Sequence, residues 1–168
     1  MENTEQKSVG ISAVLLTLCA VVGTFLLYVT DYLNHNFELQ SSIQELITEA
    51  DIVSSRSAAL LYIIYAVIAL VLLIVGFIIY KIICKLCGCK IPDSKLLLSV
   101  GIGYSVSFLT GSFLLDLAPF LAVLLIGNAL EILLVICLCF SELQKKVIPF
   151  ALMRAVLVVL NLLAFKFM

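Results

Sequence analysis

The sequence predicts an all-α, polytopic membrane protein, a five-transmembrane-helix bundle that forms a single membrane domain over residues 1–168. Of the 168 residues, 64% are hydrophobic and only 12% are charged, whereas soluble domains are about half apolar and about a quarter charged. A soluble fold of this length has too little interior to bury so much apolar surface. The apolar residues also form continuous runs without alternation, which favours helices over the strands of a membrane barrel.

Five apolar runs are each long enough for a helix that crosses a bilayer, which takes about 20 residues. They cover roughly residues 9–30, 58–83, 96–115, 118–140 and 147–165. The first run follows a mildly acidic flank and precedes no small-residue cleavage site, so we interpret it as a retained span and not as a signal peptide. Pro92, Pro119 and Pro149 mark the breaks before the last three spans. The short links there predict antiparallel neighbours.

The distribution of lysine and arginine predicts the orientation of the spans. The links after the second and fourth spans are basic and contain Lys81, Lys85, Lys90, Lys95, Lys145 and Lys146. The loop of residues 31–57 is acidic, with Asp31, Glu38, Glu45, Glu49 and Asp51 against Arg56 alone. Because basic loops stay on the cytoplasmic side, we expect the N-terminus to be cytoplasmic and both loop 31–57 and the C-terminus to be external.

Loop 31–57 also contains a helical pattern. Its apolar residues recur at helical spacing and comprise Leu39, Ile43, Leu46, Ile47 and Ala50. Ser42 followed by Glu45 is typical of a capping box. The pattern predicts a short amphipathic helix in the first external loop, lying on the outer membrane surface or against a partner that Leu39, Ile43, Leu46 and Ile47 would bind. The alternative is a helix that covers the ends of the chain's own spans.

Two opposite charges lie inside the last two predicted spans. Counted from their shared cytoplasmic link, Glu131 lies about nine residues into one helix and Arg154 about seven into the other, so their depths agree within about 3 Å. Since an unpaired charge at that depth would cost several kcal/mol, the sequence predicts an ion pair. Asn128 and Asn161 lie on the same predicted faces and extend this intramembrane polar network. The pair is either a structural clasp between helices or a site for a substrate, lipid headgroup or proton.

The third predicted span contains a helix-packing ridge of small residues. Ser99, Gly103, Ser107 and Gly111 are spaced four apart, which repeats the small-xxx-small pattern that lets another helix approach closely. The expected partner helix is in the same chain, although the pattern also fits a second copy or another protein.

Five cysteines are predicted to share the cytoplasmic leaflet: Cys84, Cys87, Cys89, Cys137 and Cys139. They are weak candidates for a metal site, because their spacing is not that of two Cys-x-x-Cys pairs and no histidine is nearby. We therefore predict no metal and no cofactor. Reduced thiols are expected there because cytoplasmic disulfides are rare.

Catalytic and nucleic-acid-binding patterns are missing from the sequence. His35 is the only histidine and lies in the external loop, and neither a nucleophile-elbow nor a metalloprotease motif occurs. An enzyme would have to use Asp31 and Asp116, which are predicted near the outer membrane face and could share a proton. Without a basic face, no nucleic-acid partner is expected.

The order of these features resembles the bacterial branch of the Yip membrane-protein family. The resemblance covers roughly residues 60–160 and is carried by Tyr80-Lys81-Ile82-Ile83, by the lysine-bearing link, and by Lys95-Leu96-Leu97-Leu98-Ser99-Val100 running into Gly103-Tyr104-Ser105. It implies a five-span protein of the bacterial plasma membrane with a non-enzymatic partner role, such as an accessory subunit beside an ABC exporter. Eukaryotic members imply a membrane-trafficking factor instead.

From these observations we expect a non-enzymatic accessory integral membrane protein that binds another membrane protein or a second copy of itself. An ABC exporter or a peptide-export or immunity complex is the first partner to consider. The alternative is a small transporter, or an ion or proton pathway, centred on Glu131 and Arg154.

Overall fold

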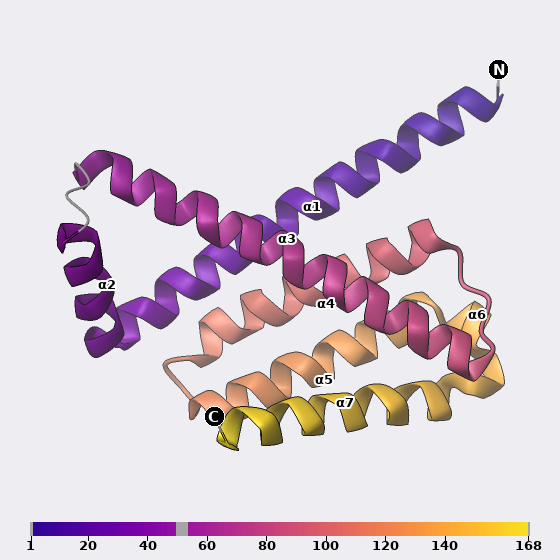
Figure 1. Ribbon diagram of the computed structural model, residues 1–168. Coiled ribbons are helices and arrows are strands. Elements are labelled where there is room, and N and C mark those ends of the chain that lie inside the picture. The colour runs from indigo at the N-terminus through magenta and orange to yellow at the C-terminus, as the bar shows by residue number, and fades with distance from the viewer. Residues whose placement is uncertain (1, 50–53, 168) are drawn as a thin grey trace.

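The computed structural model describes residues 2–49 and 54–167, except for the side chains of residues 2–9, 37, 44, 46–49, 54–58, 145, 161 and 164–167. Within this part the chain is helical and contains no strand, which confirms the predicted all-α class (Figure 1). The helices are α1 (Glu2–His35), α2 (Phe37–Glu49), α3 (Ser54–Cys87), α4 (Asp93–Leu114), α5 (Phe120–Leu138), α6 (Phe140–Leu143) and α7 (Val147–Phe167), with a 3-10 turn, η1, at Gln144–Lys146.

Four helices of the described chain are long and apolar enough to cross a membrane. They are Gly10–His35 of α1, Ala59–Cys87 of α3, Asp93–Leu114 and Phe120–Leu138. The fifth predicted span corresponds to α7, whose described apolar stretch, Val147–Leu160, is shorter. These helices are consistent with an integral membrane protein, since each is close to the length that the hydrocarbon layer requires.

A helix occupies the loop that the sequence places between the first two spans. Helix α2 begins two residues after α1 ends and runs to Glu49. Leu39 is exposed and Ile43 is partly buried, whereas the side chains of Leu46 and Ile47 lie outside the described residues. The surface that α2 presents to a membrane or to a partner therefore stays a prediction.

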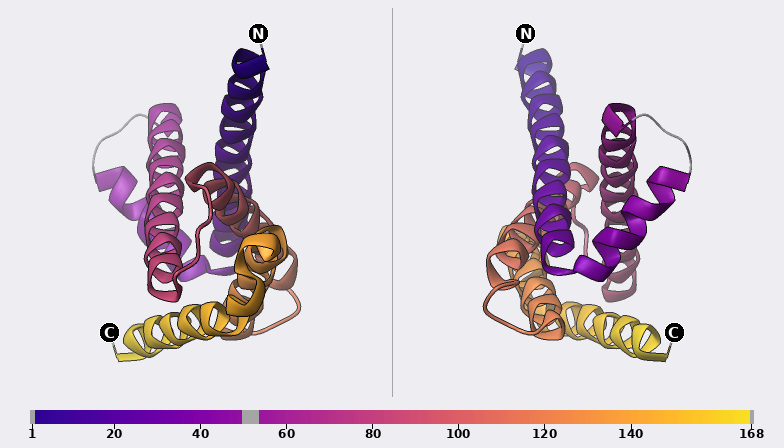
Figure 2. Two further views of the ribbon diagram at one scale, coloured as in Figure 1. Left: turned by 90° about the vertical axis from the view of Figure 1, so that its right-hand side faces the viewer. Right: turned by 90° about the vertical axis from the view of Figure 1, so that its left-hand side faces the viewer.

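Helix α4 is the centre of the arrangement. It packs along α1 and along α5, and it also contacts α3. Helices α1 and α3 cross each other, and their N-terminal parts diverge from the shorter helices (Figure 1). Figure 2 shows α3 and the C-terminal end of α7 on one side of α1, α4 and α5. Helix α3 also contacts α7, where Arg154 lies over the ring of Tyr80.

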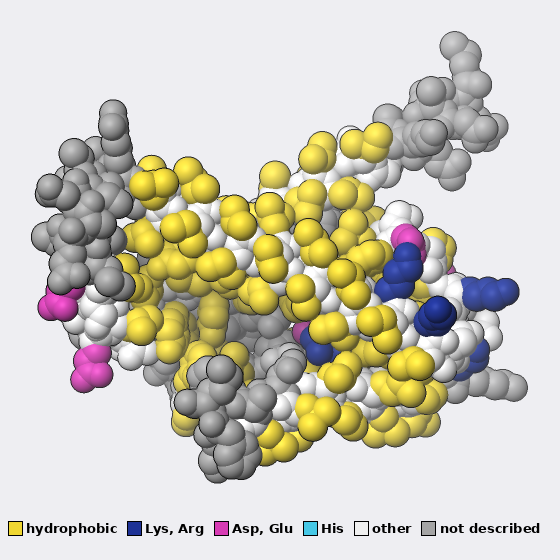
Figure 3. All heavy atoms as spheres, viewed as in Figure 1, with side chains coloured by type: hydrophobic (Ala, Val, Ile, Leu, Met, Phe, Trp, Pro, Cys, Tyr) yellow, Lys and Arg dark blue, Asp and Glu magenta, His cyan; other side chains and the backbone are white. Residues whose placement is uncertain are grey.

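The buried core is thin and sits around α4. It includes Val21, Leu73, Tyr80, Leu96, Val100, Val135, Leu143 and Phe150. Most other apolar side chains face outward and cover the visible face of the helices (Figure 3). An apolar exterior around a small core is the pattern expected when lipid surrounds the protein.

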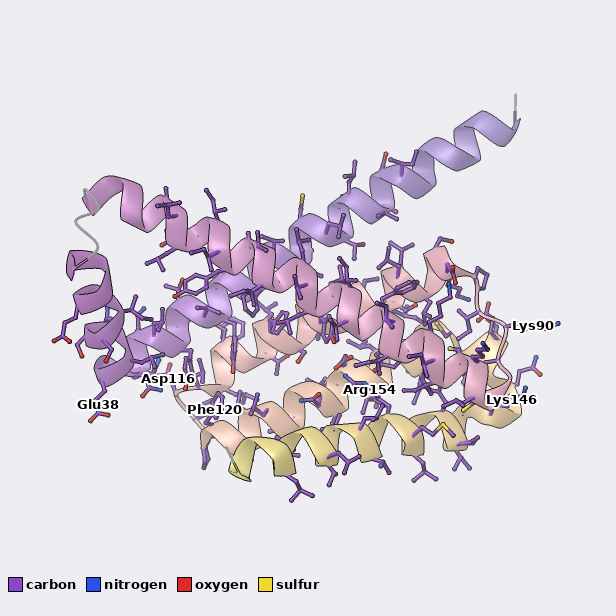
Figure 4. All side chains as sticks on the ribbon, in the orientation of Figure 1. Glu38, Lys90, Asp116, Phe120, Lys146 and Arg154 are labelled. Carbon is purple, nitrogen blue, oxygen red and sulfur yellow. The ribbon has the colours of Figure 1, made fainter. Side chains whose placement is uncertain are left out.

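Charged side chains gather at the two ends of the helices. Basic side chains cluster at one end, where Figure 4 places Lys90 and Lys146, while Glu38 and Asp116 lie at the other. The apolar helical length lies between these ends. This polarity agrees in direction with the lysine-based topology.

Candidate functional site

The small-residue ridge of α4 packs against α5 of the same chain. Near one end of this interface, the Sγ of Cys139 donates a hydrogen bond to the Oγ of Ser99 at 3.3 Å. Farther along, the backbone of Gly103 lies directly against Glu131. A Cβ at Gly103 would stand 3.2 Å from the Cγ and 3.3 Å from the carbonyl oxygen of Glu131, so glycine sets this close approach.

The other half of the ridge is also in close contact with neighbouring helices. A Cβ on Gly127 of α5 would lie 2.6 Å from the Oγ of Ser107. At Gly111 the neighbours are Tyr28 of α1 and Val123 of α5, with 2.8 Å between a Cβ and the Tyr28 ring. The ridge is therefore covered within the chain and offers no surface to a partner.

The structure brings the two predicted intramembrane charges together. The Nη2 of Arg154 on α7 donates to both carboxylate oxygens of Glu131 on α5, at 3.1 and 3.2 Å. Glu131 is 2% exposed and Arg154 is 4% exposed. The guanidinium also lies 5.1 Å from the ring centroid of Tyr80 on α3, which in turn stacks on Phe150. One buried cluster thus joins α3, α5 and α7.

The same cluster contains two buried donors without a hydrogen-bond acceptor among the described atoms, the Nε of Arg154 and the hydroxyl of Tyr80. Arginine carries five N–H donors, and the hydrogen bonds that Arg154 makes to described residues both come from Nη2. Each unsatisfied buried donor costs about 1–3 kcal/mol. The pair is therefore tightly buried but incompletely satisfied.

The predicted extension of this network through the two asparagines is not made by a hydrogen bond at Asn128. The amide nitrogen of Asn128 donates to the carbonyl of Leu124, one turn earlier in α5, at 2.8 Å. Asn128 is instead a neighbour of Glu131 on the wall of a pocket. The side chain of Asn161 lies outside the described residues.

A pocket of about 160 Å³ extends from the α1–α4 contact to Glu131. Its lining comes from four helices and comprises Tyr28, Leu72, Tyr104, Ser107, Phe108, Gly111, Val123, Leu124, Gly127, Asn128 and Glu131. The wall is mainly apolar, and its polar residues are Glu131, Asn128, Ser107, Tyr28 and Tyr104.

A row of aromatic rings forms one side of this pocket. The ring of Phe108 stacks on Tyr28 with 6.0 Å between centroids and on Tyr104 with 5.8 Å. The hydroxyl of Tyr104 lies over Gly76 of α3, where a Cβ would be 2.1 Å away. This pocket is not among the sites predicted from the sequence. The one signal in the sequence was the spacing of Tyr104 and Phe108, which places both on one face of α4.

The two aspartates considered for an enzyme each have a separate partner. The Oγ of Ser112 donates to the carboxylate of Asp31, and the His35 imidazole contacts the carboxylate of Asp116. The rings of Tyr32 and Phe120 pack nearby, with 5.1 Å between centroids. These contacts fasten the end of α1 to the turn between α4 and α5.

The cysteines at the basic end differ in burial. Cys84 and Cys139 are buried, Cys87 and Cys89 are partly buried, and Cys137 is exposed on the outer face of α5. No group of three or more potential ligands that could hold a metal ion occurs in the described part of the chain. Burial raises the pKa of the Cys139 thiol, which keeps it protonated.

Ion pairs close the same end of the bundle. The Nζ of Lys95 lies 2.7 Å from the Oε1 of Glu142, and the Nζ of Lys81 lies 2.6 Å from the Oδ2 of Asp93. Hydrogen bonds from Lys95 and Ser141 lower the pKa of Glu142. These contacts tie α4 to α6 and fix the start of α4.

Comparison of the chain with protein-family models, with curated proteins and with solved structures finds no match.

Proposed function

We propose that the chain is a non-enzymatic accessory protein of the bacterial plasma membrane that uses α1 to bind a helix of another membrane protein. In this proposal α1, α3, α4, α5 and α7 all cross the membrane, with a cytoplasmic N-terminus and an external C-terminus. The cluster of lysines at one end of the helices supports this orientation, because basic loops stay on the cytoplasmic side.

The observation that carries the proposal is an uncovered face of α1. Its residues Leu16, Cys19, Gly23 and Leu27 recur at helical spacing and are all exposed. A Cβ on Gly23 would meet no atom within 4 Å. The opposite face of α1 is filled, since Thr17 lies where a Cβ on Gly101 of α4 would reach.

Small residues on an uncovered face matter because lipid gives helices no hydrophobic reason to associate. Helices in a bilayer bind one another through close backbone contact at small residues. Cys19 and Gly23 form one small-xxx-small step, and the bulkier Leu16 and Leu27 flank it. The ridge on α4 has the same pattern but is already covered by α5 and α1. The face of α1 is therefore the surface that best fits a partner helix.

The partner is proposed from the family resemblance, which favours an ABC exporter or a peptide-export or immunity complex. Helix α2 offers a second contact through Leu39 and Ile43, which lie beyond the C-terminal end of α1. An amphipathic α2 on the outer membrane surface would place both residues against the external part of such a partner.

Two glycine substitutions on α1 form a matched test. Gly23→Leu fills the proposed contact, whereas Gly10→Leu adds the same side chain at another open site about 220° around the helix. The full chain is purified from its native membranes in mild detergent and in lipid nanodiscs. We expect one membrane protein to co-purify with the wild type and with Gly10→Leu, and its recovery to fall at least about tenfold with Gly23→Leu, a loss equivalent to about 1.4 kcal/mol.

Two results would contradict this proposal. One is recovery of the chain alone in every detergent and in nanodiscs, and the other is equal recovery of the partner with both leucine variants. Cross-linking at the exposed Cys19 adds an independent readout. A cross-link to a different polypeptide supports the accessory role, while a Cys19–Cys19 cross-link identifies a second copy as the partner.

A second candidate function is a small transporter, or an ion or proton pathway, centred on Glu131 and Arg154. The pocket that reaches Glu131 favours this function. The close burial of the ion pair favours a clasp. Measurements of ion or substrate flux into reconstituted liposomes distinguish the transporter from the clasp. A transporter loses flux when both charges are replaced, whereas a protein in which the pair is only a clasp shows no flux with either sequence.

A further inference from the structure

We infer that the pocket lined by α1, α3, α4 and α5 is a binding site for a small lipophilic organic cation, held with its ammonium group against Glu131. This inference does not depend on a partner protein and concerns a different surface from the α1 face. It is built on the volume of the pocket, its aromatic wall and the character of its polar groups.

The volume limits the occupant to one ring with a short chain. The pocket holds about 160 Å³, and an apolar cavity of about 150 Å³ accommodates benzene. A lipid is too large to enter whole. The walls contributed by Leu72, Val123 and Leu124 are apolar, so the greater part of the molecule must be apolar as well.

The aromatic row suits a positive charge. Tyr28, Phe108 and Tyr104 line the pocket, and neighbouring rings in the row have centroids 6.0 and 5.8 Å apart. The faces of aromatic rings attract cations that lie within about 6 Å, most strongly when water is excluded. A molecule that enters along this row can keep its charge near a ring face on its way to Glu131.

The polar groups of Glu131 and Asn128 accept hydrogen bonds. A carboxylate can accept about four hydrogen bonds, and Glu131 receives its two from a single nitrogen of Arg154. The amide nitrogen of Asn128 is engaged with its own helix, which leaves its carbonyl oxygen as an acceptor at the pocket wall. No lysine or arginine is among the residues that line this pocket.

Arg154 does not cancel the preference of the pocket for a cation. Glu131 lines the pocket and Arg154 does not, so Glu131 is the charged residue among those that line it. Folded proteins contain buried carboxylates that contact two cationic side chains. An anion would be repelled by the carboxylate, and the donors on the described wall are only the neutral hydroxyl groups of Tyr28, Tyr104 and Ser107.

The test uses the full chain in lipid nanodiscs and three probes that share a phenylethyl group. Phenethylamine is a cation at neutral pH, propylbenzene is its neutral isostere, and 3-phenylpropionate is an anion. Binding of tritiated phenethylamine is measured by scintillation proximity against empty nanodiscs, and the other two compete for it. We expect phenethylamine to bind at least about tenfold more tightly than propylbenzene, as a charge-assisted hydrogen bond implies, and 3-phenylpropionate not to compete.

Two sets of variants locate the site. Leu72→Trp fills the pocket from α3 and should weaken phenethylamine binding at least about tenfold. Val71→Trp adds the same ring at the preceding residue, which does not line the pocket and is 51% exposed against 39% for Leu72, and should leave binding unchanged. Replacing both charges, Glu131→Gln with Arg154→Met, avoids an unpaired charge and should make phenethylamine and propylbenzene bind equally.

The binding measurements have outcomes that support the inference and outcomes that overturn it. Cation preference that disappears with the double replacement, together with loss of binding in Leu72→Trp alone, supports the inference. Absence of binding to the wild type, equal binding of the three probes, or equal effects of the two tryptophans would overturn it. Gly23→Leu should not change probe binding, so failure of the partner proposal would leave this result intact.

Discussion

Replacing Glu131 and Arg154 singly and together measures what their contact contributes to the fold. Breaking a buried ion pair by removing one partner costs about 3–5 kcal/mol, because the other charge stays buried. Glu131→Gln should fall at the upper end of this range, since Arg154 is 4% exposed and its Nε already lacks an acceptor. Arg154→Met should cost less, because the stranded carboxyl group can take up a proton and become neutral.

The double variant should be nearly as stable as the wild type, within about 1 kcal/mol, since an apolar or neutral pair of similar volume often matches a buried ion pair. The coupling energy of the double-mutant cycle, the sum of the two single losses minus the double loss, is then at least about 5 kcal/mol. The assay is reversible unfolding in mixed micelles. Leu133→Met on α5 and Met153→Leu on α7 are exposed controls that should change little. Additive effects of the two single replacements would refute the reasoning.

Three further predictions concern packing and titration. Gly103→Ala should lower unfolding stability by about 1–3 kcal/mol, because the new Cβ would lie 3.2 Å from the facing side chain of α5; an equal loss with the exposed Ile102→Ala would contradict this. Tyr80→Phe should leave the free energy of unfolding unchanged or raise it by about 1 kcal/mol, because it removes a buried hydroxyl without an acceptor among the described atoms. A clear loss of stability would show that the hydroxyl has a partner. Lys95→Met should raise the lowered pKa of Glu142 towards its ordinary value of about 4.3, as followed by NMR titration of the carboxyl carbon. Because the folded pKa is the lower one, the stabilising contact is present above the ordinary pKa and is lost as the pH falls through the folded value.

The features that sequence reasoning located correctly depend on counting along a helix. Glu131 and Arg154 are at matched depths because each was counted from the same short link, and the structure pairs them. The spacing from Ser99 to Gly111 indicated a packing face, and the short link to α5 made α5 the natural neighbour. Both arguments use only the helical repeat and the length of a connection.

The features that could not be predicted depend on how distant helices cross. The pocket forms because α1 brings Tyr28 to Phe108, and no local pattern specifies that crossing. Cys137 and Cys139 show that composition alone does not predict which of two nearby thiols is buried. They are two residues apart and therefore face opposite sides of the helical chain, so only Cys139 is buried, although composition alone treats the two thiols as a pair.

The position of the ion pair along the chain has a consequence for biosynthesis. Glu131 precedes Arg154 by 23 residues, so it leaves the ribosome first, and α5 reaches the translocon ahead of its counter-charge. A helix with a bare carboxylate inserts less readily, and we therefore expect α5 and α7 to enter the lipid as a hairpin. A chain truncated at residue 146 should show less complete insertion of α5 in a glycosylation-mapping assay, and Glu131→Gln should restore it. Restoration by Leu133→Met instead would show that the carboxyl group does not govern insertion.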